Sequence, residues 1–197
     1  VLDQIGTSTD RGACFHGRGP SCSVEPVQIK SEKEPHKALN LKKEDLIWAL
    51  GNMIRSRISD DKHLTLVKQG KSFFHIGCSG HEAAQTAIAM AMKKKHDWGW
   101  TYYRDMAYMY GLGLTAKEYF LLALAKKDDP STGGRQMPNH YGHPELNQPS
   151  QSSPTGTQFL QAVGSALAAR KMGADDLTYV SSGEGTTSQG EFYEAVN

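Results

Sequence analysis

The alternation of apolar and polar positions predicts helices over most of the chain. Between residues 46 and 58, apolar side chains recur every three or four positions, which is the period of an α-helix. Asn40 is a suitable N-cap and Gly70 a suitable terminator. We therefore predict a helix that starts after Asn40 and reaches about Val67, and the polar run 59–61 allows a break within it.

The same periodicity predicts several further helices, whose ends carry recognisable signals. Thr115 is expected to cap one helix, Gly173 to close another, and Gly111 and Gly113 to break a third. The predicted spans are 81–92, 106–110, 116–126, 158–172 and 191–196.

The apolar run Leu177–Val180 predicts a short buried strand, which breaks at Gly183-Glu184-Gly185. Glycines let a backbone come close to a phosphate, and a carboxylate between them can hold a divalent cation. Most such triplets are ordinary turns, so the triplet alone is a weak signal. The succession of helices and a buried strand predicts an α/β fold.

Three loops carry residue types that are suited to chemistry. In the loop 71–80, His75 is a candidate functional residue, and a structural hydrogen bond is the alternative. The aromatic cluster 98–105 contains Arg104, whose planar guanidinium suits phosphate oxygens, although core packing with an ion pair would also explain it. The segment 128–153 has four prolines and little periodicity, which is typical of active-site loops.

Composition narrows the classes of function. The 197 residues include 22 Lys and Arg against 21 Asp and Glu, and this balance argues against broad binding to nucleic acid or anionic membranes. No apolar run is long enough to span a bilayer. Free thiols are favoured for the three cysteines, although Cys14 and Cys22 could pair. Residues 1–37 lack periodicity and are predicted to form a poorly ordered tail ahead of the domain 38–197.

Several motifs then occur in one order. They are Gln69-Gly-Lys71, Gly80-His-Glu-Ala83, Tyr103-Arg-Asp105, Gly134-Arg-Gln-Met-Pro138, His140, Ser153-Pro-Thr-Gly-Thr-Gln158 and Gly183-Glu-Gly-Thr-Thr-Ser-Gln-Gly190. From about Asn40 to Asn197, the chain resembles the alpha subunit of the thiamine-diphosphate-dependent decarboxylating component of 2-oxo acid dehydrogenase complexes. The resemblance implies a thiamine-diphosphate-binding fold, in which helices flank a parallel sheet.

The resemblance also implies roles for individual residues. Glu184 would ligate magnesium, and His75 and His140 would be the catalytic candidates near the substrate. The cofactor would be bound by Tyr103, Arg104, Ser153, Thr155, Gly183, Glu184, Gly185 and Thr186. A potassium ion would be held by Ser152, Pro154, Thr157 and Gln158.

The implied activity is oxidative decarboxylation of a 2-oxo acid, followed by acyl transfer to the lipoyl group of a transacylase core. The triplet carries Glu184 where Asp is commoner in the family. Branched-chain members often show Glu there, so a branched-chain substrate is favoured over pyruvate. The implied partners are a beta subunit, in an α2β2 assembly, and the transacylase. A cytoplasmic location is expected, or the mitochondrial matrix in a eukaryote. The alternatives are an acetoin dehydrogenase alpha subunit and a non-catalytic interaction fragment.

The cofactor signature of that family is expected to continue beyond Asn197, where this sequence ends. The second magnesium ligand and a downstream histidine would lie in that continuation. We therefore expect the chain to be the N-terminal part of a longer subunit. Alone, it is expected to be inactive and marginally stable, because a parallel sheet needs both faces covered.

Overall fold

A computed structural model describes residues 35–197 of the chain. The predicted tail, apart from its last residues, and two of the cysteines, Cys14 and Cys22, therefore lie outside the described residues. The chain divides into two units, Val1–Asn40 and Leu41–Asn197. In the first unit, a short helix α1 covers Pro35–Ala38, across the predicted domain boundary at Lys37.

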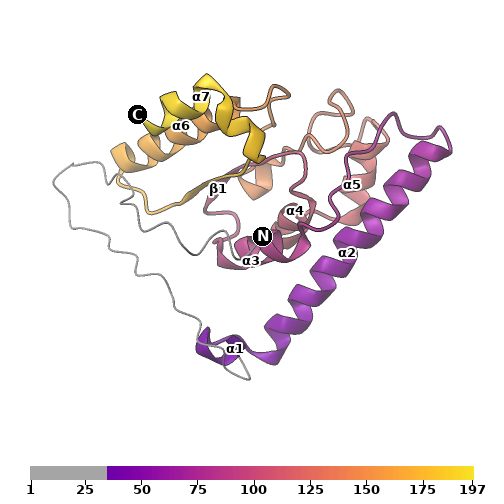
Figure 1. The fold of residues 1–197 in the computed structure, drawn as a ribbon, viewed down its shortest axis with the longest axis horizontal. Coiled ribbons are helices and arrows are strands. Elements are labelled where there is room, and N and C mark those ends of the chain that lie inside the picture. Colours follow the sequence, from indigo (N-terminus) through magenta and orange to yellow (C-terminus); the bar gives the residue numbers. More distant parts are fainter. Residues whose placement is uncertain (1–34) are drawn as a thin grey trace. The chain divides into compact units, whose positions relative to one another are not determined.

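The second unit alternates helices with two short strands (Figure 1). Its α-helices are α2 (Lys43–Lys68), α3 (Glu82–Ala91), α4 (Met106–Leu112), α5 (Ala116–Ala123), α6 (Thr157–Met172) and α7 (Gly190–Val196). Its strands are β1 (Trp98–Trp100) and β2 (Thr178–Val180), and its 3-10 helices are η1 (Pro144–Leu146) and η2 (Glu184–Ser188). Among the described helices, none is long and apolar enough to cross a membrane.

The two strands form a parallel pair in which Trp98 lies opposite Thr178 and Trp100 opposite Val180. Helix α6 packs against both strands and beside α7 (Figure 1). The indole Nε1 of Trp100 donates to Ser165 Oγ of α6 over 3.0 Å and ties the helix to β1. The predicted α/β class, with a parallel sheet flanked by helices, is confirmed.

The main core lies where α3, α4 and α5 meet, and it is rich in tyrosine. The fully buried large apolar side chains are Tyr108, Tyr110, Tyr119, Tyr141, Met106, Met109 and Leu122. Contrary to the prediction, Gly111 lies inside α4 and does not break it. The reason is packing, because a Cβ on Gly111 would collide with the Cβ of Ala89 in α3.

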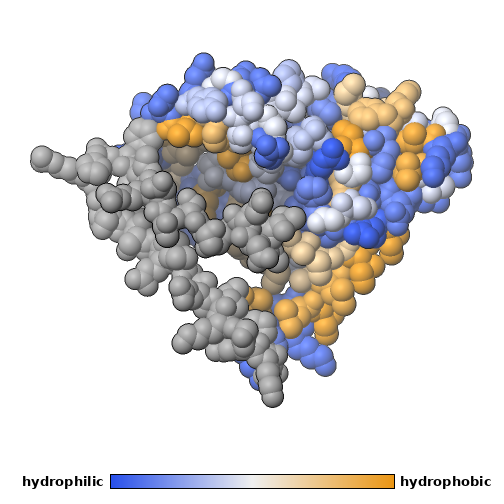
Figure 2. All heavy atoms as spheres, viewed as in Figure 1, coloured by the Kyte–Doolittle hydropathy of each residue, from blue (hydrophilic) through white to orange (hydrophobic). Residues whose placement is uncertain are grey.

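Helix α2 turns a polar face toward the rest of its unit. Asn52 Nδ2 donates to Thr86 Oγ1 over 2.9 Å and to the carbonyl of Ala107 over 2.8 Å. The polar residues that α2 buries are Asn52, Ser56, Ser59, Asp60 and His63. Its exposed apolar residues are Leu46, Ile47, Trp48, Leu50, Ile54, Ile58 and Leu64, which contribute an orange band along the helix in Figure 2.

Two predictions about α2 are wrong. The helix runs through residues 59–61 without a break, because Ser59 and Asp60 are buried there and hydrogen-bonded to neighbouring elements. Its N-cap is Lys42 and not Asn40, which adopts a left-handed conformation with φ of 54°. The backbone N–H of Lys42 donates to Asp45 Oδ2 over 2.8 Å and satisfies one end group of the helix.

The strand β2 lies where it was predicted, but it is not buried as expected. The residues of β2 are half-buried, and Leu177 is 63% exposed. Beside β2, an apolar groove is lined by Phe159, Ala162, Val163, Ala166, Thr178, Val180, Phe192, Ala195 and Val196. Strand β1 was missed, because an aromatic cluster around a glycine has no two-residue alternation.

Candidate active site

The carboxyl ends of β1 and β2 lie side by side, since the strands are parallel and in register. Residues 102–105 follow β1, and residues 181–185 follow β2. The backbone N–H of Tyr102 donates to Ser181 Oγ over 3.1 Å. A Cβ on Gly183 would lie 3.0 Å from the hydroxyl of Tyr102, so this glycine lets the two segments approach. The structure therefore places two of the predicted site segments at one edge.

Asp105 holds these two segments together. The residue is 3% exposed, and its carboxylate accepts hydrogen bonds from Ser181 Oγ and from the backbone N–H of Tyr102. Gln85 Nε2 of α3 donates to the same carboxylate over 3.3 Å. Burial raises the pKa of Asp105 to about 6, although the bonds from Ser181 and Tyr102 oppose this shift.

Arg104 supplies the positive charge at this edge. Its Nη1 donates to the carbonyl of Gly77 over 2.7 Å, and its guanidinium carbon lies 5.2 Å from the centre of the Tyr103 ring. The rings of Tyr103 and Tyr102 lie against each other with centroids 3.8 Å apart. Burial, together with the Tyr103 hydroxyl, raises the pKa of Tyr102 to about 12. These contacts fix the guanidinium and leave it half-buried.

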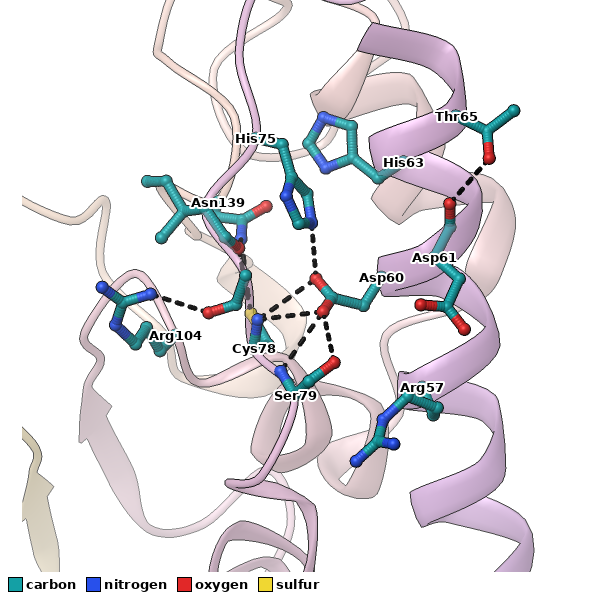
Figure 3. Close-up of polar contacts among 12 residues, drawn as sticks. Arg57, Asp60, Asp61, His63, Thr65, His75, Cys78, Ser79, Arg104 and Asn139 are labelled. Atoms are coloured by element: carbon teal, nitrogen blue, oxygen red, sulfur yellow. Dashed lines mark hydrogen bonds and ion pairs between the residues drawn. The ribbon is translucent and has the colours of Figure 1, made fainter. Parts of the chain in front are cut away.

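The loop that holds Gly77 is anchored by Asp60 of α2 (Figure 3). His75 Nε2 donates to Asp60 Oδ1 over 2.7 Å. The N–H groups of Cys78 and Ser79 and the hydroxyl of Ser79 donate to the same carboxylate, at distances from 2.9 to 3.2 Å. Since Nε2 of His75 carries the donated proton, Nδ1 is the acceptor nitrogen of the neutral ring.

His63 lies behind His75, with ring centroids 5.2 Å apart, and it is fully buried. Ser72 Oγ donates to the carbonyl of Ala123, so His63 Nε2 must donate to Ser72, over 3.0 Å. The Tyr119 hydroxyl lies 2.7 Å from His63 Nδ1 and donates to Asn139 Oδ1 over 3.1 Å. Burial lowers the pKa of His63 to about 4, which keeps this arrangement neutral.

His140 belongs to a second loop, which touches the first. Asn139 Nδ2 donates to the carbonyl of Ile76 over 3.1 Å. His140 Nδ1 donates to the carbonyl of Pro138, which leaves Nε2 to accept from Ser153 Oγ over 3.1 Å. These contacts link three residues that are far apart in sequence. His140 touches Ser153 directly, and its neighbour Asn139 touches Ile76, which follows His75.

The segment before α6 and the first turn of this helix hold the residues predicted to bind potassium. Thr157 Oγ1 donates to the carbonyl of Pro154 over 3.0 Å. Gln158 Oε1 accepts from the N–H of Gly156, and its Nε2 donates to the carbonyl of Ser181 over 3.2 Å. Pro154, Thr157 and Gln158 therefore share one turn next to the end of β2. Ser152 is half-buried and Thr155 is exposed.

The donor set at the sheet edge fits an anion that carries a divalent cation. Arg104 offers a cation after β1, and Glu184 an exposed carboxylate after β2. Among the described residues, no three histidine, cysteine or acidic side chains form a metal cluster. A magnesium ion at Glu184 would therefore take most of its ligands from phosphate and water, which is usual for this ion. A Cβ on Gly185 would meet no atom of the described residues within 4 Å, whereas Thr186 is buried.

Sequence reasoning missed the residues that position the site. Asp60, Asp105, Asn139 and Ser181 are buried or half-buried and make the contacts that join its loops. For Asp60 a signal existed, because Asn52, Ser56, Ser59 and His63 share its face of α2 at helical spacing. A polar stripe of this kind indicates a buried hydrogen-bonding face when the opposite stripe is apolar and exposed.

The fold and site thus define an α/β protein in which Arg104 and Glu184 follow the carboxyl ends of two parallel strands. Residues 51–197 match the family model described as the dehydrogenase E1 component. The chain belongs to this family, and the resemblance seen in its motifs is confirmed.

Curated relatives of the chain include alpha subunits from bacteria. The chain is 40% identical to the 2-oxoisovalerate dehydrogenase subunit alpha of Bacillus subtilis (strain 168), over 82% of this chain and 49% of the relative. It is 31% identical to the 3-methyl-2-oxobutanoate dehydrogenase subunit alpha of Mycobacterium tuberculosis (strain ATCC 25618 / H37Rv), over 90% and 47%. It is 32% identical to the pyruvate dehydrogenase E1 component subunit alpha of Staphylococcus aureus (strain Mu50 / ATCC 700699), over 80% and 40%. The chain therefore spans about half the length of these relatives or less.

Proposed function

We propose that the chain is part of the alpha subunit of a thiamine-diphosphate-dependent 2-oxo acid dehydrogenase, an oxidoreductase. Membership of the dehydrogenase E1 component family supports this proposal. The observation that carries it is the position of Arg104 and Glu184 just beyond the paired ends of two parallel strands. A diphosphate with its magnesium ion needs this combination of a cation and a carboxylate.

The residues of this chain would bind and orient the cofactor. Arg104 would neutralise the diphosphate, while the carbonyl of Gly77 and the ring of Tyr103 hold its guanidinium in place. Glu184 would hold the magnesium ion, and the small residues Gly183 and Gly185 would let the backbone approach. When bound, thiamine diphosphate supplies a nucleophilic carbon and an electron sink for the loss of carbon dioxide.

Two histidines would hold protons near that site, and their hydrogen bonds support this role. His140 Nε2 accepts the hydroxyl proton of Ser153, so the lone pairs of Ser153 Oγ remain available to a donor on the ligand. His75 donates through Nε2 to Asp60, so Nδ1 is the nitrogen that can take up a proton. Both rings are held in one tautomer by a neighbouring acceptor, which suits a role in proton handling.

The finer features of the activity are proposals that the relatives and the motifs support. A branched-chain 2-oxo acid is the proposed substrate, since identity is 40% to the 2-oxoisovalerate enzyme of Bacillus subtilis and 32% to the pyruvate enzyme of Staphylococcus aureus. A beta subunit and a lipoyl-bearing transacylase are the proposed partners. A potassium ion is proposed at the turn of Pro154, Thr157 and Gln158.

Calorimetric titration with thiamine diphosphate and magnesium tests the proposal. The protein is the subunit in its natural length, co-expressed with its beta partner. We expect magnesium-dependent binding that Glu184→Ala abolishes and Glu194→Ala leaves unchanged, because Glu194 is an exposed carboxylate on α7. Unchanged binding in Glu184→Ala would overturn the assignment of the triplet. Comparing 2-oxoisovalerate with pyruvate as substrates then tests the branched-chain preference.

A further inference from the structure

A single peptide group connects two oppositely charged side chains of the site (Figure 3). The N–H of Cys78 donates to both carboxylate oxygens of Asp60 over 3.1 Å. The carbonyl of Gly77, which belongs to the same peptide unit, accepts from Arg104 Nη1 over 2.7 Å. Asp60 on α2 and Arg104 after β1 are therefore linked through one rigid, planar group.

Asp60 is committed to this loop. Its side chain is 4% exposed, and its remaining donors are the His75 ring and the backbone N–H and hydroxyl of Ser79. All of these donors come from residues 75–79, which form no helix or strand. A buried carboxylate must be compensated by donors, so the charge of Asp60 dictates the conformation of the loop.

The geometry makes the two ends of the peptide reinforce each other. In a trans peptide the N–H and C=O point in opposite directions. A negative charge at the N–H and a positive charge at the C=O polarise the group in the same sense, so each hydrogen bond strengthens the other. The guanidinium is consequently held in one orientation by a carboxylate that it does not touch.

We propose that Asp60 is a positioning residue for Arg104, acting through the Gly77–Cys78 peptide so that the guanidinium is pre-oriented for a diphosphate. This inference rests on the proposed function, which gives Arg104 its ligand. A pre-oriented guanidinium binds more tightly, because little freedom is lost when the ligand arrives. Without the carboxylate, the peptide loses its acceptor and the carbonyl of Gly77 loses its fixed direction.

The test compares neighbouring aspartates on one helix. Asp60→Asn keeps the shape of the side chain but removes its charge and presents an amide donor to the donors of the loop. Asp61→Asn makes the same chemical change at an exposed position. With the natural-length subunit and its beta partner, we expect Asp60→Asn to raise the Kd for thiamine diphosphate with magnesium about tenfold or more, as for other supporting residues. Asp61→Asn should change it less than about twofold, as is usual for surface substitutions.

A double-mutant cycle distinguishes positioning from general damage to the fold. If Asp60 acts through Arg104, Asp60→Asn should cause no further loss of affinity in an Arg104→Ala background. Equal losses in both backgrounds would mean that Asp60 only stabilises the fold, and would overturn the proposal. An unchanged Kd in the single variant Asp60→Asn would overturn it as well.

Two further arms keep the test decisive. If Asp60→Asn does not fold, Ser79→Ala removes one donor to the carboxylate and leaves the peptide in place. A moderate rise in the Kd, again absent when Arg104 is alanine, supports the proposal, and an unchanged Kd contradicts it.

The double-mutant cycle is also run with inorganic pyrophosphate and magnesium. The protein could bind pyrophosphate but not thiamine diphosphate, with the effects of Asp60→Asn and Arg104→Ala still coupled. That result would refute the proposed function and preserve the role of Asp60. Failure to bind either ligand would refute both.

Discussion

Asp105 accepts a hydrogen bond from the hydroxyl of Ser181, a residue 76 positions further along the chain. This contact closes the edge of the sheet where β1 and β2 end. It fixes the segment of Tyr103 and Arg104 against the segment of Gly183 and Glu184. Cofactor binding and local stability should therefore depend on the same hydrogen bond.

Ser181→Ala tests this relationship. The substitution removes a donor from a buried carboxylate, so we expect a loss of about 1 to 3 kcal/mol in the free energy of unfolding. The pKa of Asp105 should rise further above about 6, because the bond from Ser181 lowers it. Urea denaturation and titration followed by NMR measure the two effects. Ser182→Ala is the control, since the buried Ser182 hydroxyl has no hydrogen-bond partner among the described residues. Equal stability of the two variants would contradict the prediction.

The buried His63 should make the protein sensitive to acid. Its pKa is about 4 in the folded chain and 6.5 in the unfolded chain, so the unfolded chain binds the proton first. Stability is therefore lost as the pH falls from 6.5 toward 4. At pH 5 this single group should cost about 2 kcal/mol relative to pH 7.

The contribution of His63 is isolated by comparison with variants. The difference in unfolding free energy between pH 7 and pH 5 should shrink in His63→Gln, because the titrating group is gone. The exposed His81 provides the control, and His81→Gln should retain the full difference. The interpretation fails if both variants keep the pH dependence of the wild type.

Two helix glycines should respond to alanine in opposite directions. A methyl group added at Gly51 in α2 would have no atom of the described residues within 4 Å, so Gly51→Ala should stabilise by about 0.5 to 1 kcal/mol. In α4 the same change at Gly111 would drive a methyl into Ala89, with an expected net loss of about 1 to 3 kcal/mol. Thermal unfolding of both variants checks the signs. A stabilised Gly111→Ala protein would show that α3 and α4 do not pack this closely.

Alanine substitutions at the two glycines beside Glu184 should affect stability at one position and cofactor binding at the other. Gly183→Ala would place a methyl 3.0 Å from the Tyr102 hydroxyl, so it should lower the melting temperature, and Tyr102→Phe should partly restore it. Gly185→Ala has open space around the new methyl in the described part of the chain and should leave the melting temperature unchanged. It should nevertheless weaken binding of thiamine diphosphate, if the backbone of Gly185 approaches the phosphates. Calorimetry measures the melting temperature and the cofactor binding of both variants. An unchanged melting temperature in Gly183→Ala, or unchanged binding in Gly185→Ala, would contradict these expectations.

Local features of the sequence predicted most elements. Thr115 accepts from the N–H of Glu118 at the start of α5, and Gly173 closes α6 in a left-handed conformation, as expected from their residue types. These signals work because caps depend on the chemistry of one or two residues. The motif residues that follow β2 were also identified correctly as lying beyond a strand.

Periodicity alone did not show which face of α2 is buried. The apolar stripe with Ile47, Ile54 and Ile58 is exposed, and the opposite stripe with Asp60 and His63 is buried. A helical period is the same whichever stripe faces the protein, so only the neighbouring elements determine the choice. Similarly, β1 is a strand because it pairs with β2, although its own sequence has no strand pattern.

The sequence by itself determined most of the helices, the strand β2, the motifs and, through them, the family. These depend on local chemistry and on residue order, which a chain carries without folding. Only the tertiary structure decided which carboxylates hold the site together. Asp60 reaches Arg104 through the Gly77–Cys78 peptide, and Asp105 reaches Ser181 across the paired strand ends. Such contacts depend on distances between segments that are remote in sequence, and those distances are fixed only when the helices and strands pack.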